Sequence, residues 1–132
     1  MIDEVVYFNR EVLGISPRYP DKLVNAEKQW LLQALQEEVE ELRDAGSVAE
    51  SVDALIDLIY FALGGLYRHG LLEDDIRGCF TAVHSANLMK KRGVKASRPQ
   101  DGSVADAVKP EGWKDPVHTI QEILLEALRT PR

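Results

Sequence analysis

Residues 31–63 decide the fold, and they read LLQALQEEVEELRDAGSVAESVDALIDLIYFAL. Apolar residues recur with a period near 3.6 on both sides of Gly46, which is the period of an amphipathic helix. Gly46 stands in the usual position just past a helix end. Ser47 followed by Glu50 forms a capping box, the pattern with which a new helix begins. Two helices joined by so short a turn run antiparallel, so this stretch predicts a helical hairpin.

The rest of the chain shows the same period, and no segment shows the sustained alternation of a half-buried strand. We therefore expect an all-α fold, a bundle of about five helices around the central hairpin. The expected helices run from about Asp3 to Leu13, from Asp21 to Ala45, from Ser47 to Gly70, from Glu73 to Arg92, and from Asp115-Pro116 to Arg129. Gly64 and Gly65 inside the third helix cost about 1 kcal/mol each relative to alanine, which predicts that another backbone packs closely on them.

A long loop from Gly93 to Pro116 separates the last two expected helices. It contains three prolines and three glycines and has no periodicity. Loops of this length in compact domains are usually functional or disordered. The segment is a candidate lid over a ligand, and a surface segment or an arm exchanged between subunits are the alternatives. Because no repeat or second domain is visible, we expect residues 1–132 to form a single domain.

Composition narrows the possible partners. The chain has 16 basic and 22 acidic residues, a net charge of −6, which opposes binding to polymeric nucleic acid. The longest apolar run, residues 58–67, has ten residues, whereas a membrane span needs about 20. Cys79 is the only cysteine, so no internal disulfide can form, and the N-terminus lacks the features of a secretory signal. We expect a cytoplasmic protein with no membrane partner.

Glutamates crowd the second expected helix. Four of them fall in five consecutive positions, Glu37, Glu38, Glu40 and Glu41, where like charges repel one another. At about 100° per residue, Glu38 and Glu41 lie on one flank of the apolar stripe, whereas Glu37 and Glu40 point further out. The stripe consists of Leu31, Leu32, Leu35, Val39 and Leu42.

The third expected helix repeats this arrangement. Its apolar stripe, which we expect to be core, consists of Val48, Val52, Leu55, Ile59, Ala62, Leu63 and Leu66. Glu50, Asp53 and Asp57 gather on the other side, within about 60° of one another. Tyr60 and Phe61 lie there too, so this second face predicts a buried polar site or a subunit interface.

Hairpin geometry brings the two acidic sets together. With the turn just after Gly46, residues whose numbers sum to about 93 face one another, so Asp53 and Asp57 bracket Glu38 and Glu41. A glutamate-rich helix is usually a solvated face. However, carboxylates that converge in register cannot all stay ionised without a cation, and oxygen ligands select Mg²⁺ or Mn²⁺. The candidate metal ligands are Glu38, Glu41, Asp53 and Asp57, with Glu50 as a further candidate.

These residues resemble a known superfamily. Glu37-Glu38-x-x-Glu41-Leu42, followed by residues 53–60, is similar to the ExxE…ExxD signature of the all-α nucleoside triphosphate pyrophosphohydrolases. Residues 83–90, VHSANLMK, and residues 109–113, KPEGW, look like segments of its MazG-like branch. Phosphoribosyl-ATP pyrophosphohydrolase, another member, matches these C-terminal segments less well.

The second motif departs from the family pattern. Glu50 precedes Asp53 by three residues, as the signature requires, yet only eight residues separate it from Glu41. Anchoring on Asp57 instead puts Ala54 where the family has glutamate. Both alignments remain open.

The resemblance implies Mg²⁺-dependent hydrolysis of a nucleoside triphosphate to monophosphate and pyrophosphate. The substrate would be a deoxynucleotide or non-standard nucleotide, and the role nucleotide-pool housekeeping. Glu37, beside the ligand Glu38, would act as general base or would position water. Five helices with a second apolar and acidic face predict a homodimer that completes the bundle, and the resemblance implies that a tetramer is also possible. The alternative is a non-catalytic helical dimer with a binding or regulatory role.

Substrate contacts are expected near the end of the fourth helix. Asn87 can hydrogen-bond a base or sugar, and Lys90 and Lys91 can meet phosphate, although lysines there also complement the helix C-terminus. His84, one turn earlier, can join the same pocket or serve a structural role.

Two tryptophans and a loop lysine complete the candidate set. Trp30, two turns before Glu37, can stack on a base or lie in the core. Lys109 and Trp113 belong to the long loop and would contact the nucleotide if the loop closes over it.

Overall fold

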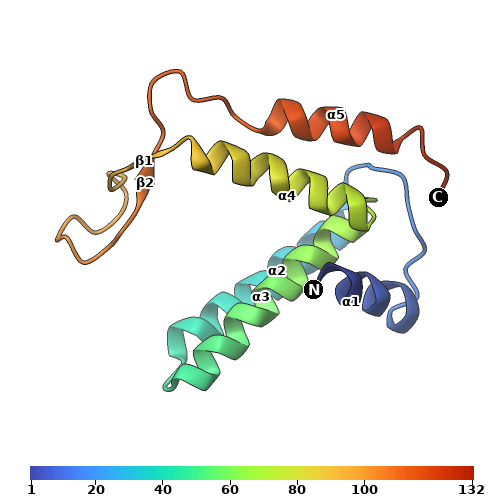
Figure 1. The fold of residues 1–132 in the computed structure, drawn as a ribbon. Helices are drawn as coiled ribbons and strands as arrows, with labels where there is room; N and C mark the ends of the chain where they lie inside the picture. The colour runs from blue at the N-terminus through green and yellow to red at the C-terminus, as the bar shows by residue number, and fades with distance from the viewer. The chain divides into compact units, whose positions relative to one another are not determined.

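The computed structural model describes residues 1–132, and its regular structure is helical apart from one short strand pair (Figure 1). The helices are α1 (Ile2–Tyr7), the π-helical turn η1 (Phe8–Val12), α2 (Asn25–Asp44), α3 (Val48–Arg68), α4 (Glu73–Leu88) and α5 (Val117–Ala127), and the strands are β1 (Lys91–Arg92) and β2 (Ala107–Val108). The all-α prediction and the five expected helices are confirmed. The chain divides into two compact units, residues 1–76 with 124–132 and residues 77–123, and a single domain stays a prediction.

The hairpin of α2 and α3 is the centre of the first unit, and Figure 1 shows the two helices side by side and antiparallel. Ser47 caps α3 as predicted, although its bond to the Glu50 carboxylate comes from the hydroxyl and not from the backbone amide of a full capping box. The amide of Glu50 donates to Oγ of Ser47 at 3.1 Å, and this hydroxyl donates to Oε1 of Glu50 at 3.1 Å. The first bond satisfies a backbone amide that a helix N-terminus would otherwise leave unpaired, and the second orients the capping hydroxyl. The predicted hairpin is therefore confirmed.

The start of α2 differs from the prediction, because the helix begins at Asn25 and not at Asp21. The amide of Asp21 donates to the carbonyl of His69 at 3.0 Å. This long-range hydrogen bond holds the segment before Asn25 outside the helix. Val24 has an extended backbone with ψ of 153°. Residues 21–24 therefore serve as an anchor to the end of α3.

Small residues of α3 receive side chains from the neighbouring elements. A Cβ at Gly65 would come within 2.8 Å of Cδ2 of Leu31 on α2, and a Cβ at Gly64 within 3.1 Å of Nδ2 of Asn9 on η1. Ala54, which lies nearer the start of α3, is 1% exposed. The expectation that Gly64 and Gly65 admit another backbone is therefore wrong, because they admit side chains.

The apolar stripe of α3 is not covered within the chain. Its exposed members range from 36% exposure at Leu66 to 81% at Val48, and they also include Val52, Leu55 and Ile59. On α2, Leu32 and Val39 are exposed as well. The expectation that these stripes form the core of one chain is wrong. Periodicity identifies an apolar face but not its partner, and α3 instead uses its small residues for packing within the chain.

The second unit departs most from the sequence-based expectation. The helix α4 ends at Leu88, four residues before the predicted end, because Lys91 and Arg92 form β1 and pair antiparallel with β2. The amide of Gly93 continues the ribbon with a 3.1 Å bond to the carbonyl of Asp106. Asp115 caps α5 as predicted, with Oδ1 accepting from the amide of Val117 at 2.9 Å.

No helix of the chain combines the length and the hydropathy that a membrane crossing requires.

Candidate metal centre

Three acidic side chains meet between the hairpin helices. Glu38 and Glu41 lie on α2, and Asp57 lies on α3; one carboxylate oxygen from each falls within 4.8 Å of the other two. We call these three residues the acidic cluster. Glu38 is the most enclosed and Glu41 the most exposed, so the cluster opens to solvent on one side. A spacing of three residues on α2 places Glu38 and Glu41 on one face, and the antiparallel partner supplies the third acid.

Charge repulsion within the cluster is strong. Burial, together with a hydrogen bond to Glu41 and the charges of Asp57, Glu41 and Asp53, raises the pKa of Glu38 to about 7. Burial and the charges of Asp53 and Glu41 also raise the pKa of Asp57, although a hydrogen bond from Glu38 opposes the shift. Without a cation, the cluster therefore retains a proton at a pH where isolated carboxylates have lost theirs.

The cluster has the donors that a hard divalent cation requires. Oε2 of Glu38 is buried and has no hydrogen-bond partner, which is costly for a carboxylate oxygen unless a ligand meets it. All donors are carboxylate oxygens, the type that Mg²⁺ and Mn²⁺ prefer. The residues present therefore fit such a cation.

The other two predicted ligands lie outside the cluster. Glu50 and Asp53 line a neighbouring cavity of about 590 Å³, which Glu41 also lines. The carboxylate of Glu50 accepts the hydroxyl bond of the capping residue, so its observed role is structural. Asp53 acts on the cluster through its charge. Geometry thus groups Asp57, and not Glu50, with Glu38 and Glu41. Glu37, the predicted base, lines this same acidic cavity, as do Glu40 and Asp44.

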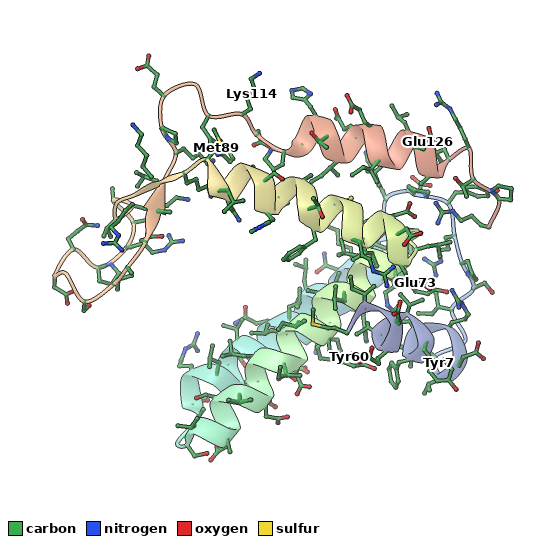
Figure 2. The ribbon with its side chains drawn as sticks, in the orientation of Figure 1. Tyr7, Tyr60, Glu73, Met89, Lys114 and Glu126 are labelled. Atoms are coloured by element: carbon green, nitrogen blue, oxygen red, sulfur yellow. The ribbon has the colours of Figure 1, made fainter.

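A second cavity, of about 410 Å³, adjoins the acidic cluster. Asp57 belongs to the cluster and also lines this cavity. Four of the cavity's nine lining residues are aromatic. Trp30 and Phe61 meet edge to face with ring centroids 6.0 Å apart, and Phe8 and Tyr60 do the same at 5.6 Å. Tyr60 lies on α3 and is labelled in Figure 2. We call this space the aromatic cavity; its remaining lining includes Asn9, Gly64 and Arg68.

An ion-pair network fixes one wall of the aromatic cavity. The guanidinium of Arg68 lies 4.0 Å from the ring centroid of Trp30 and bonds to Oε2 of Glu27 at 2.9 Å. Arg18 bonds to Oε1 of the same glutamate at 2.8 Å. Burial raises the pKa of Glu27, but the hydrogen bonds from Arg18 and Arg68 outweigh it and lower the pKa below its usual value. Trp30 therefore lies at the edge of a cavity and not in the core.

The remaining predicted substrate contacts lie in residues 77–123. Trp113 donates from Nε1 to the carbonyl of Ala86 at 2.7 Å, and the Nζ atoms of Lys90 and Lys109 lie 5.3 and 4.8 Å from its ring centroid. Two lysines are thus gathered around one indole. The others, His84 and Asn87 on α4 and Lys91 on β1, are exposed. The prediction that Lys90 and Lys91 end a helix is wrong, because α4 stops before them.

Sequence reasoning missed two polar residues of the aromatic cavity, Asn9 and Arg68, together with Phe8 and Leu13. An asparagine in an amphipathic N-terminal helix carries no signal until its partner on α3 is known. Arg68 resembled an ordinary cation in the last turn of a helix. The pairing of acids with Tyr60 and Phe61 on one face of α3 was the available clue.

Comparison with protein families identifies a family to which this site belongs. A family model described as phosphoribosyl-ATP pyrophosphohydrolase matches residues 15–87, more than half of the chain. The chain belongs to the phosphoribosyl-ATP pyrophosphohydrolase family. Its matched region contains the acidic cluster and most of the aromatic cavity. No curated protein matches the chain.

Family membership makes the protein a pyrophosphohydrolase of the all-α nucleoside triphosphate pyrophosphohydrolase superfamily. The predicted enzyme class and superfamily are confirmed. The matched family is that of phosphoribosyl-ATP pyrophosphohydrolase, which the C-terminal segments of the sequence resembled less than the MazG-like branch. The match ends at residue 87, so it does not include the two lysines around Trp113. The MazG-like branch stays a prediction.

Proposed function

We propose that the protein hydrolyses the α–β phosphoanhydride of a nucleotide in the presence of Mg²⁺ or Mn²⁺ and releases pyrophosphate. The observation that carries this proposal is the acidic cluster, in which Oε2 of Glu38 is buried without a partner. The protein is acidic and its substrate is a polyanion, so a cation between them is an electrostatic requirement. We further propose that it acts in the cytoplasm.

Different residues of the chain would bind the cation and activate the attacking water. Glu38, Glu41 and Asp57 would hold the cation, which when bound supplies Lewis-acid chemistry by neutralising phosphate oxygens and lowering the pKa of the attacking water. Glu37 is exposed, lines the acidic cavity beside Glu41, and accepts a 3.3 Å bond from Nε2 of Gln33 that orients its carboxylate. We assign Glu37 as the base that takes the proton of the attacking water.

The substrate is either a nucleoside triphosphate of the cellular nucleotide pool or phosphoribosyl-ATP, the compound in the name of the family. The sequence segments around Asn87 and Trp113 favour a deoxynucleotide or non-standard triphosphate and a housekeeping role. The family match favours phosphoribosyl-ATP. Both contain the same α–β anhydride within a nucleotide, so the acidic cluster serves either. The assignments of Lys90, Lys91 and Lys109 to phosphate contacts, and of His84, Asn87 and Trp113 to the nucleoside, stay sequence-based predictions.

We predict metal-dependent pyrophosphate release from at least one nucleotide. The protein would be incubated with Mg²⁺ and a panel of ribonucleoside and deoxynucleoside triphosphates, non-standard nucleotides and phosphoribosyl-ATP, with pyrophosphate and orthophosphate measured separately. Chelation with EDTA is the control and should abolish release. Orthophosphate as the primary product, or no reaction with any nucleotide, would contradict the proposal. A non-catalytic dimer, the alternative that family membership disfavours, would also show no shift of melting temperature with Mg²⁺.

The exposed stripe of α3 supports a further part of the proposal, association of two or four copies. Apolar side chains recur there at helical spacing, over a length that a monomer rarely exposes. Pairing this face with its copy would bury it and complete the bundle. We therefore propose a homodimer or tetramer in which α3 forms the interface.

A double substitution Leu55→Glu, Ile59→Glu is expected to shift the protein to monomer, because two charges would be desolvated in each half of the interface. Light scattering after size-exclusion chromatography measures the mass. Leu125→Glu, at a more exposed apolar position on α5, is the control and should leave the mass unchanged. A monomeric parent protein would refute the α3 interface.

A further inference from the structure

We propose that the aromatic cavity binds the base of the substrate, and that Asn9 determines which base is accepted. This inference rests on the proposed function and extends it, because the acidic cluster accounts only for the phosphates. Among the residues predicted from sequence, Trp30 would stack on any base, and the amide of Asn87 is exposed, so water can satisfy it when a base does not pair with it. Strong selectivity therefore requires a buried polar group elsewhere in the chain.

Location is the first argument. Asp57 lines the aromatic cavity and belongs to the acidic cluster, so a nucleotide whose phosphates lie at the cluster can reach the cavity with its base. The volume of about 410 Å³ lies within the range of small-molecule sites. Four of the cavity's nine lining residues are aromatic and others are polar, a combination that suits a planar ring with a polar edge.

Rigidity of the stacking wall is the second argument. Trp30 is held on one side by the guanidinium of Arg68, which is itself held by Glu27, and its ring meets Phe61 edge to face. An indole fixed in this way loses little conformational freedom when a base stacks on it. Stacking tolerates every base, because each has a π-face, so Trp30 supplies affinity and not selectivity.

The Asn9 amide is the third argument. It is 4% exposed, and its Nδ2 donates to the carbonyl of Val5 at 2.9 Å. It lies directly over Gly64, where a Cβ would come within 3.1 Å of Nδ2 and 3.4 Å of Oδ1. One donor is used, so the amide retains one N–H and its oxygen for a ligand.

Selectivity follows from that fixed amide. A side-chain amide reads a base edge that presents a donor beside an acceptor. A base that fails to pair with it leaves a buried polar group unsatisfied, and such sites reject the wrong ligand strongly. Among the polar residues of the cavity, Arg68 is engaged with Glu27 and Asp57 with the acidic cluster. The hydroxyl of Tyr60 rotates to donate or to accept, so it pairs with either kind of base edge and does not discriminate. Asn9 is therefore the group available to read the base.

Tryptophan fluorescence tests where the base binds. The chain has two tryptophans, so Trp113→Phe leaves Trp30 as the sole reporter, and Trp30→Phe is the reciprocal variant. Both would be titrated, with Mg²⁺, against nucleotides whose α–β bridge is a non-hydrolysable methylene. Quenching in Trp113→Phe, its absence in Trp30→Phe, and no quenching by inorganic tripolyphosphate are expected. Equal quenching by tripolyphosphate, or none by any nucleotide, would overturn the cavity assignment.

Substitution of Asn9 tests the discrimination. With Asn9→Ala, the ratio of affinities between the best and worst bases should fall by about 10-fold to 100-fold, while the affinity for tripolyphosphate is retained. A purely structural role would weaken all ligands equally and leave the ranking intact, which would overturn the assignment. If Asn9→Ala does not fold, Gly64→Ala decides, because its Cβ displaces the same amide; Gly46→Ala, with nothing within 4 Å, is its control.

The two proposals fail separately, because binding is measured with ligands that are not hydrolysed. Base-dependent quenching without pyrophosphate release from the natural nucleotides would refute the proposed function and uphold this inference. Pyrophosphate release together with an unchanged base ranking in the Asn9 and Gly64 variants would refute this inference and uphold the proposed function.

Discussion

Glu38→Gln is expected to abolish pyrophosphate release and, at the same time, to stabilise the metal-free protein at neutral pH. Activity should fall by about 1,000-fold or more, because the variant lacks one anionic ligand of the cation that the reaction requires. Stability should rise because the substitution removes the most enclosed charge of the acidic cluster. Burial and the neighbouring Glu41, Asp57 and Asp53 disfavour ionisation of Glu38, as its pKa of about 7 shows.

The measurements are pyrophosphate release and the melting temperature, each with and without Mg²⁺. The parent protein should gain melting temperature from Mg²⁺, and Glu38→Gln should not, because its cluster has lost a ligand. Glu40→Gln is the matched control: it removes the same charge two residues away, from a side chain whose Oε1 accepts a bond from Gln36 and which lies outside the cluster. It should keep activity and the Mg²⁺ effect. A Glu38→Gln protein that is less stable without metal, yet still stabilised by Mg²⁺, would contradict the assignment.

The parts of the fold that sequence predicted are those that local interactions determine. The start of α3, and with it the place of the hairpin turn, follows from the bonds between Ser47 and Glu50, three residues apart. Gly46 marks the turn in the sequence, but it does not adopt the positive φ of a helix-closing glycine. The start of α2 did not follow, because the bond that keeps Asp21 out of the helix comes from the carbonyl of His69, far along the chain. The end of α4 depends likewise on β2.

The same distinction applies to the candidate site. Helical spacing and hairpin register sufficed to bring Glu38, Glu41 and Asp57 together. They did not separate Asp57 from Glu50, because both lie in one sector of a helical wheel and only the capping bond shows that Glu50 is engaged. Asn9 was invisible from sequence, because its place depends on the packing of η1 over Gly64.

The effect of pH on stability should reverse sign when Mg²⁺ is added. Glu38 has a folded-state pKa of about 7 against an ordinary value of 4.5, and the pKa of Asp57 is raised as well. Between these values the native state binds more protons than the unfolded state, so the free energy of unfolding of the metal-free protein falls as pH rises. Carboxylates with lowered pKa, such as Glu27 and Asp106, act in the opposite direction, but at more acidic pH.

Melting temperatures between about pH 5 and pH 8, at constant ionic strength, test this inversion. Without metal the parent protein should lose stability across the range, and with saturating Mg²⁺ the loss should disappear or become a gain, because the cation binds only ionised carboxylates and so binds more tightly as pH rises. Glu38→Gln should flatten both profiles, whereas Glu40→Gln should reproduce the parent. A metal-free profile that rises through this range would show that Glu38 is ionised without a cation. The repulsion from which the metal centre was inferred would then be absent.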